Sequence, residues 1–289
     1  MEFVEQQQDL MLSYLACKVK GLDKNQDIAY CGRANFEDSS KNYDWFVGCD
    51  GHGKIGNDNF IEILKKVDWT NIMRQENSLD ALLYVIKDKK YNFQTGSTYY
   101  EAKIYNNRVE ICSVGDSKIK VFVNKQIVYS TTPHNLKNQK ERERLRERIE
   151  KGKMIIEKCE NIPEMQNSNT IKFVKGEYYY FDNKNTKLAM TQSLGHNNIT
   201  GLQPEKEVIH FEEGLEVQVI GGSDGLWDVV MENEVYDKDV DTLLTLAESR
   251  WIGEWNIDWN GELYQDKFPI YDDITVCICK NNFEQNKKF

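Results

Sequence analysis

The chain has 289 residues and four prolines, and no Pro/Gly/Ser-rich linker divides it, so we expect one domain over residues 1–289 with a substantial core. Its 37 Lys and Arg against 47 Asp and Glu give a formal net charge of −10, which argues against nucleic acid and anionic membranes as partners, because both need basic protein surface. Seven cysteines without a C-x-x-C pair, and no apolar run long enough to span a bilayer, indicate a reduced, soluble protein, which we expect to be a monomer in the cytoplasm or nucleus.

Apolar periodicity predicts the secondary structure. In chain order we expect strands over 11–20, 28–31 and 45–49, helices from 60 and from 78, a β-meander over 98–132, a helix over 135–151, a hairpin over 170–181, strands near 207–211 and 215–221, a helix near 239–250 and a last strand over 274–280. Antiparallel strand runs mixed with grouped helices indicate the α+β class.

Local signals refine these elements. Asn57 or Asp58 is expected to cap the helix near 60, and Ser78 the next helix. Lys175-Gly176 is expected at the tip of the 170–181 hairpin. Trp251, Trp255 and Trp259 recur every four residues, which favours the core-facing side of a helix over an aromatic docking stripe.

Acidic turns stand at the ends of several apolar runs. They are Asp50-Gly51-His52-Gly53, Gly115-Asp116, Asp224-Gly225 and Asp272-Asp273. Carboxylates that gather away from water are costly unless a cation neutralises them. If these acids meet, they call for hard cations with oxygen ligands, Mg²⁺ or Mn²⁺ by preference. Each turn is also an ordinary turn dipeptide, so the sequence leaves open whether they meet.

Six motifs occur in order along the chain: Asp50-Gly51-His52-Gly53, Gly96-Ser97-Thr98, Val114-Gly115-Asp116-Ser117, residues 188–195, Ser223-Asp224-Gly225-Leu226-Trp227-Asp228 and Asp272-Asp273-Ile274-Thr275-Val276. Over about residues 10–280 this succession resembles the metal-dependent serine/threonine protein phosphatases of type 2C. The resemblance implies a β-sandwich of two antiparallel sheets flanked by α-helices, a four-layer αββα fold with a metal cleft at one end. It also implies hydrolysis of phosphoserine and phosphothreonine in phosphorylated proteins by attack of a metal-activated water.

The resemblance also implies roles for single residues. Asp50 would bridge two Mg²⁺ or Mn²⁺ ions and the backbone carbonyl of Gly51 would ligate one of them, while Asp224 and Asp272 would complete the shell of the other. Asp116 matches the acid that helps to hold a third, weaker ion. His52 would protonate the leaving alkoxide, and the ordinary histidine pKa of about 6.5 suits a general acid near neutral pH.

The first acidic motif has two candidate positions. Phe36-Glu37-Asp38 carries the pair that is commoner in the family, but it leaves too little chain before Asp50 for the strand, hairpin and strand expected there. We therefore prefer Asp27, with Gln26 where many members have Glu. The usual phosphate-binding arginine has no clean counterpart, which leaves Lys20 or Lys24, each a point charge without the bidentate fork of arginine.

Two departures from the family pattern stand near residue 190. Gln192 and His196 replace the usual Arg and Asp, a change that would lower activity or alter the flap that grips the substrate. The alternative to an active phosphatase is therefore a catalytically weak pseudophosphatase that acts as a phosphoprotein-binding or regulatory module.

Overall fold

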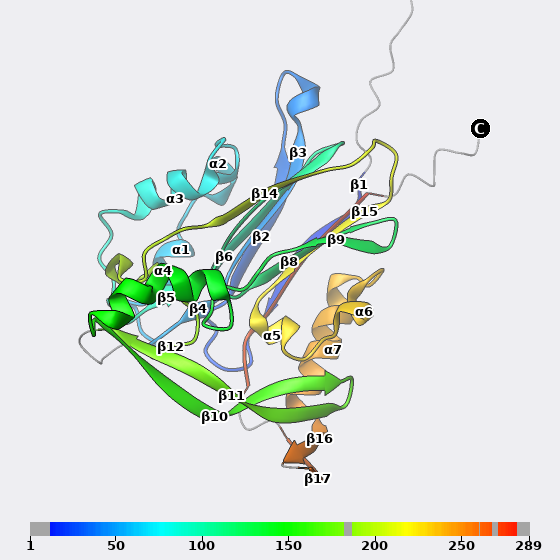
Figure 1. Ribbon diagram of the computed structural model, residues 1–289. Helices are drawn as coiled ribbons and strands as arrows, with labels where there is room; N and C mark the ends of the chain where they lie inside the picture. Colours follow the sequence, from blue (N-terminus) through cyan, green and yellow to red (C-terminus); the bar gives the residue numbers. More distant parts are fainter. Residues whose placement is uncertain (1–11, 182–186, 260, 268–270, 282–289) are drawn as a thin grey trace, which may run out of the picture.

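Alternating apolar residues build two five-stranded antiparallel sheets that stack face to face at the centre of the molecule (Figure 1). The computed structural model describes residues 12–181, 187–259, 261–267 and 271–281. The first sheet has the order β1 (Leu12–Lys20), β18 (Ile274–Asn281), β15 (Val217–Gly222), β8 (Lys118–Val123) and β9 (Gln126–Ser130). The second has the order β14 (Glu205–His210), β7 (Arg108–Val114), β6 (Tyr99–Ile104), β3 (Tyr43–Cys49) and β2 (Ile28–Ala34).

Helices cover the two outer faces of this sandwich (Figure 1). Against the second sheet lie α1 (Phe60–Leu64), α2 (Trp69–Met73) and α3 (Ser78–Ile86), and against the first lie α5 (Asp224–Trp227), α6 (Glu232–Val235) and α7 (Val240–Ile252). Because each sheet buries one face on the other and one face under helices, the layers run α, β, β, α. This arrangement confirms the expected fold class.

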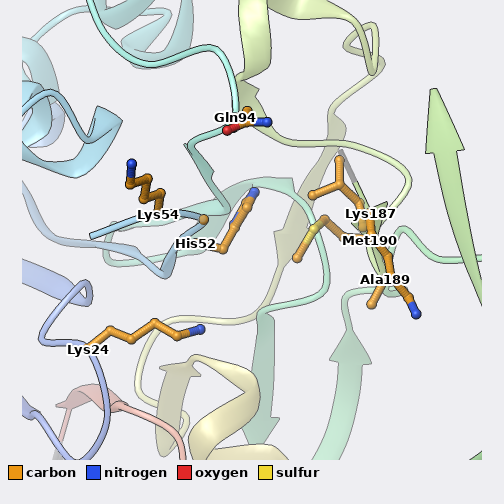
Figure 2. Close-up of a pocket in the computed structure, with 9 residues that line it drawn as sticks. Lys24, His52, Lys54, Gln94, Lys187, Ala189 and Met190 are labelled. Atoms are coloured by element: carbon orange, nitrogen blue, oxygen red, sulfur yellow. The ribbon is translucent and has the colours of Figure 1, made fainter. Parts of the chain in front are cut away.

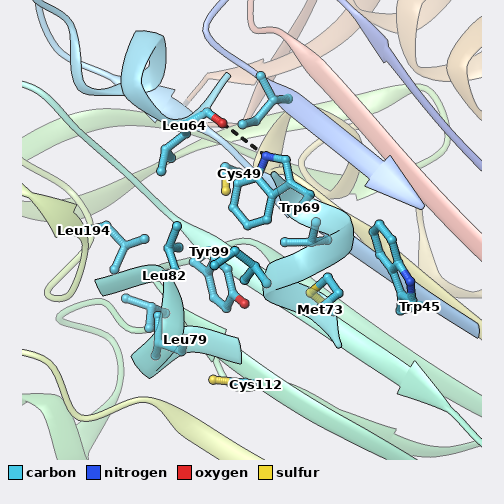
Figure 3. Packing of buried hydrophobic residues seen from close by; sticks show 14 of the residues in the cluster. Trp45, Cys49, Leu64, Trp69, Met73, Leu79, Leu82, Tyr99, Cys112 and Leu194 are labelled. Atoms are coloured by element: carbon cyan, nitrogen blue, oxygen red, sulfur yellow. Dashed lines mark hydrogen bonds between the residues drawn. The ribbon is translucent and has the colours of Figure 1, made fainter. Parts of the chain in front are cut away.

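The core has one apolar layer between each pair of neighbouring layers. Between the sheets, Phe46 and Tyr100 of the second sheet meet Val121, Val219 and Cys277 of the first. Under α1–α3, the Trp69 indole donates a 3.1 Å hydrogen bond to the Leu64 carbonyl and stacks near Tyr99 (Figure 3). These buried aromatic groups fix the distance between the layers and therefore the positions of the strand ends.

A further sheet extends from one end of the sandwich, beside the long helix α4 (Gln139–Glu150) (Figure 1). Its strands are β10 (Met154–Asn167), β11 (Thr170–Phe181), β16 (Glu254–Trp259), β17 (Glu262–Lys267) and the short β12 (Lys187–Leu188). Three two-residue strands, β4 (Gly51–His52), β5 (Gly96–Ser97) and β13 (Leu194–Gly195), form a small sheet, and the 3₁₀ turns are η1 (Ser39–Lys41) and η2 (His196–Asn198).

The predicted hairpin over 170–181 is wrong, because residues 170–181 form a single strand. The turn lies between Asn167 and Thr170, and β11 pairs with β10 along its length. Gly176 stands where the register shifts between Cys159 and Ile162. The Lys-Gly pair therefore marks an irregularity inside a strand, a common place for glycine, and not the tip of a hairpin.

The tryptophan stripe and the helix caps also differ from expectation. Trp251 lies in α7, but that helix ends at Ile252 and Trp255 belongs to β16; both rings are nevertheless buried in one core cluster.

The N-caps of α1 and α3 are Asn59 and Asn77, whose side chains accept hydrogen bonds from the backbone N–H groups two and three residues further on. Each cap is an asparagine next to the expected residue, and an amide oxygen serves this purpose as well as a carboxylate or hydroxyl. The helix expected over 135–151 begins only at Gln139.

No helix among the described residues combines the length and the apolar character needed to cross a bilayer.

The closeness of the two sheets predicts the effect of one substitution. A Cβ added at Gly221 would lie 2.7 Å from the Phe46 ring and 2.8 Å from the Tyr100 ring, inside a close-packed layer. We expect Gly221→Ala to lower the free energy of unfolding by about 1–3 kcal/mol, as overpacking does. The matched control is Gly56→Ala, where the only near atom belongs to an exposed loop, with an expected change within about 0.5 kcal/mol. Urea unfolding measures both; equal values would contradict the packing described.

Candidate active site

Asp50 is held where β3 leaves the second sheet. Its backbone N–H donates to Thr98 Oγ1 at 3.0 Å, and its carbonyl accepts from the Thr98 N–H at 2.9 Å and from the Ser97 hydroxyl at 3.0 Å. The Gly-Ser-Thr motif therefore serves to clamp the acidic turn. Gly51 cannot carry a side chain, because its Cβ would lie 2.5 Å from the Gln26 carbonyl oxygen.

Asp224 and Asp272 come from the neighbouring ends of β15 and β18. A Cβ on Gly225 would lie 1.9 Å from the Asp273 carbonyl oxygen, so the two acidic turns are packed directly on each other. The Trp251 indole fixes the first turn with a 2.6 Å hydrogen bond to the Gly225 carbonyl. Asp27 is buried beside them, and its Oδ2 accepts from the Thr275 hydroxyl at 2.5 Å.

Burial and the charges of neighbouring carboxylates raise the pKa values of Asp50, Asp272 and Asp27. Burial, followed by the charges of Asp224, Asp27 and Asp272, raises the pKa of Asp50 well above its usual range. Burial and the charges of Asp224 and Asp27 raise the pKa of Asp272 to about 9, and burial outweighs hydrogen bonding to raise the pKa of Asp27 to about 7. Acids that lie far apart in the sequence thus repel one another at one end of the sandwich.

Asp116 lies in the tight turn between β7 and β8. Gly115 has a φ of +103° and lies against Thr98, and its N–H donates to His134 Nδ1 at 3.0 Å. Burial and the charge of Asp224 raise the pKa of Asp116 to about 8. Asp116 therefore interacts electrostatically with the cluster of Asp27, Asp50 and Asp272 through the charge of Asp224.

The donor set fits a hard divalent cation. Asp224 Oδ1, Asp116 Oδ1 and Gln26 Oε1 are buried oxygens without a hydrogen-bond partner, although buried polar atoms are normally paired. Carboxylate oxygens that repel one another and lack partners are what Mg²⁺ and Mn²⁺ bind. Within the described residues, no group of three or more His, Cys, Asp or Glu side chains is placed so that it could hold a metal ion without adjustment of the side chains.

Asp273 differs from its neighbour Asp272. Its two carboxylate oxygens accept hydrogen bonds of 2.9, 3.0 and 2.7 Å from the backbone N–H groups of Leu22, Asp23 and Gln26. Asp273 therefore fixes the loop between β1 and β2, and with it Asp27.

The alternative position for the first acidic motif was Glu37-Asp38. Asp38 caps the exposed turn η1 through Ser40 and has no contact with the acids above.

A cavity of about 380 Å³ opens beside His52. Its walls carry Lys24, Lys54 and Lys187 together with the apolar side chains of Leu188 and Met190 (Figure 2). Lys20 points elsewhere, since its ammonium group pairs with Glu248 of α7 at 3.0 Å. Of the two lysines expected from the sequence, only Lys24 lines this cavity.

Gln192 is bound by groups outside the acidic site. Its amide nitrogen donates to Glu141 at 2.8 Å, and its Oε1 accepts from the Gln203 N–H at 2.8 Å. Arg144 of α4 pairs with the same Glu141 at 2.8 Å and also donates to the Thr191 carbonyl at 2.8 Å. A guanidinium group is therefore present beside this motif, but it comes from a different part of the chain.

Sequence reasoning did not place Asp228, Lys54 or Lys187 at the site, and it singled out His196 without its contact to His52. Desolvation, followed by the charge of Asp224, raises the pKa of Asp228; the i, i+4 spacing of these two acids was a readable signal. His196 contacts His52, with 2.8 Å between their Nε2 atoms. Lys54 and Lys187 line the cavity, and nothing in their sequence surroundings marked them.

The family model described as Protein phosphatase 2C matches residues 13–238. Since this is well over half of the chain, the chain belongs to the protein phosphatase 2C family. No curated protein matches it by sequence.

Solved structures share the fold. A C. elegans sex determining protein has a TM-score of 0.59 at 16% identity, over 94% of this chain and 66% of that one. A bacterial serine phosphatase has 0.52 at 17% identity, over 93% and 97%, and the serine/threonine phosphatase Stp1 from Staphylococcus aureus has 0.50 at 17%, over 94% and 95%. At these identities the likeness concerns the fold alone.

The raised carboxyl pKa values predict how stability depends on pH. Asp27, Asp116 and Asp272 bind protons more tightly in the folded chain than in the unfolded one, so their contribution is full below about pH 4 and is lost as the pH rises through about 7–9. With a chelator present, we expect Tm to fall between pH 5 and 9 by on the order of 5 °C.

The control for this pH dependence is Asp224→Asn, which removes the charge that raises the other pKa values and should flatten the curve. Mg²⁺ should flatten it as well, by replacing protons as the neutralising charge. Calorimetric scans at four pH values measure both effects. A chelated wild-type protein that is more stable at pH 9 than at pH 5 would contradict the gathered carboxylates.

Proposed function

We propose that the chain is a Mg²⁺- or Mn²⁺-dependent protein serine/threonine phosphatase that hydrolyses phosphoserine and phosphothreonine. The observation that carries the proposal is the meeting of Asp27, Asp50, Asp224 and Asp272 at one end of the sandwich, beside an imidazole and a lysine-lined cavity. Membership of the protein phosphatase 2C family supports the same reaction class.

The acidic turns would hold the ions. Asp50 would bridge two of them, the Gly51 carbonyl and the carboxylates of Asp224 and Asp272 would complete their shells, and Asp27 would lie next to them. Asp116 would face a third ion, in keeping with its unpartnered Oδ1. When bound, such ions supply a water of lowered pKa and neutralise phosphoryl oxygens.

Two side chains would act on the substrate itself. His52 follows the acidic turn directly and lies at the cavity, where an imidazole can hand a proton to the leaving alkoxide. Lys24 reaches the same cavity, and its positive charge would bind the phosphate. The chain as a whole, with its net charge of −10, does not favour binding of an anion. The apolar wall at Leu188 and Met190 would accept the carbon chain of a phosphorylated protein segment.

The alternative is a module that binds phosphoproteins without turnover. Gln26 favours it, because a neutral amide with an unpartnered Oε1 stands where a second acid would strengthen ion binding. Turnover separates the two functions, since both bind phosphorylated segments but only one releases phosphate.

The first test is phosphate release from a phosphothreonine peptide in Mn²⁺ buffer. We expect Asp224→Asn to lower kcat/KM by roughly 100-fold or more, because a direct ligand matters at least as much as the partners that orient ligands. The matched control is Asp241→Asn, an exposed acid on α7 that should leave the rate unchanged. Equal rates in wild type and Asp224→Asn would refute the enzyme, and wild-type peptide binding without turnover would favour the alternative.

The second test compares the two lysines. Lys24→Ala should raise KM for the phosphopeptide by roughly 10-fold, because the loss of one charge-assisted contact costs about 1.4 kcal/mol of binding free energy. Lys20→Ala removes the same charge at the end of β1, four residues earlier, but the ammonium group of Lys20 is paired with Glu248 away from the cavity. Steady-state kinetics should therefore show an unchanged KM for Lys20→Ala; the reverse order would assign the phosphate contact to Lys20.

A further inference from the structure

Two histidines distant in the sequence, the half-buried His52 and the buried His196, form a hydrogen-bonded pair. The Nε2 atoms of His52 and His196 are 2.8 Å apart, and the rings stack with centroids 5.0 Å apart at 22°. The other ring nitrogen of His196, Nδ1, lies 3.1 Å from the Phe93 carbonyl oxygen. His196 is 1% exposed, so these are its main polar contacts.

The hydrogen-bond pattern fixes the position of each proton. A carbonyl oxygen only accepts, so Nδ1 of His196 carries a hydrogen. In a neutral ring, Nε2 of His196 is then an acceptor, and the hydrogen between the two rings belongs to Nε2 of His52. Burial keeps the His196 ring neutral by lowering its pKa to about 4. Nδ1 of His52 is left as a buried atom without a partner.

The backbone is shaped to hold this contact. His196, Asn197 and Asn198 have φ values of 47°, 48° and 59°, three consecutive residues in the left-handed region that side chains other than Gly, Asn and Asp rarely adopt. Below the ring, Gly96 leaves the necessary space, because a Cβ there would lie 2.5 Å from His196 Cδ2. Strain of this kind persists where the surroundings over-determine it, often at functional sites.

We propose that His196 is a positioning residue for His52: its neutral imidazole accepts the Nε2 hydrogen of His52 and fixes the ring and its tautomer, so that Nδ1 of His52 takes up a proton from water and passes it to the leaving alkoxide. The inference rests on the proposed function for that last step. A neutral acceptor also has a physical advantage at this position. A carboxylate, which the resembled family usually has here, would add one more negative charge close to Asp50 and its neighbours, whereas an imidazole orients His52 without it.

Two substitutions separate the contact from the fold. Asn tolerates the left-handed backbone, and its short amide group reaches the Phe93 carbonyl but not His52, so His196→Asn removes only the contact between the rings. Gln is longer and can place an amide oxygen where Nε2 of His196 stands, so His196→Gln restores the acceptor.

The tautomer is measured by two-bond ¹H–¹⁵N correlation NMR on histidine-labelled full-length protein in Mg²⁺ buffer. We expect His52 to be protonated on Nε2 in the wild type and in His196→Gln, and to become a mixture of tautomers in His196→Asn. This readout needs no catalytic activity, so it stands or falls separately from the proposed function. A wild-type His52 protonated on Nδ1 would overturn the inference even if neither variant folded.

Kinetics supply the second readout. His196→Asn should lower kcat roughly 10-fold for the phosphothreonine peptide, whose alkoxide needs a proton, and less than about threefold for para-nitrophenyl phosphate, whose leaving group does not. KM should stay unchanged for both substrates, and His196→Gln should recover most of the peptide rate. An equal fall for both substrates, or no recovery in His196→Gln, would show a merely structural role for His196.

Discussion

Repulsion among carboxylates is the constraint on which this structure depends. Four acidic segments from opposite ends of the chain are brought to one end of the sandwich, where burial and mutual charge raise the pKa values of Asp50 and Asp272. Such an arrangement lowers the stability of the metal-free protein at neutral pH. It persists because the two stacked sheets and their aromatic layers are stable enough to hold the strand ends in place.

The acids are positioned by backbone contacts. Thr98 and Ser97 clamp the turn at Asp50, Asp273 gathers three backbone N–H groups of the loop before Asp27, and Trp251 ties the Gly225 turn to α7. These residues touch no substrate in the proposed function, yet each fixes one acid. The same principle accounts for Gln192 and Arg144, which join α4 to the strand that leads into the turn at His196.

Much of this arrangement could be predicted from the sequence. Apolar periodicity predicted most of the elements and the α+β class, and the sandwich itself was implied by the resemblance of the six motifs to a known family. The spacing before Asp50 favoured Asp27, which the fold places beside Thr275 and away from the exposed Asp38. Local signals failed where tertiary contacts decide: Gly176 lies at a strand irregularity, and Trp255 continues into a strand after the helix ends. The contact between His52 and His196 was beyond prediction, because it depends on a left-handed backbone and on the space above Gly96.

The central claim is that the oxygens of Asp50, Asp224 and Asp272 share divalent ions. Anomalous diffraction from crystals soaked in Mn²⁺ tests it directly, because the anomalous signal identifies the metal and its ligands without any assumption about activity. We expect at least two Mn²⁺ peaks within about 2.0–2.3 Å of these carboxylates, with Asp50 bound to both. Mn²⁺ bound elsewhere, or absent from all three acids at millimolar concentration, would contradict it.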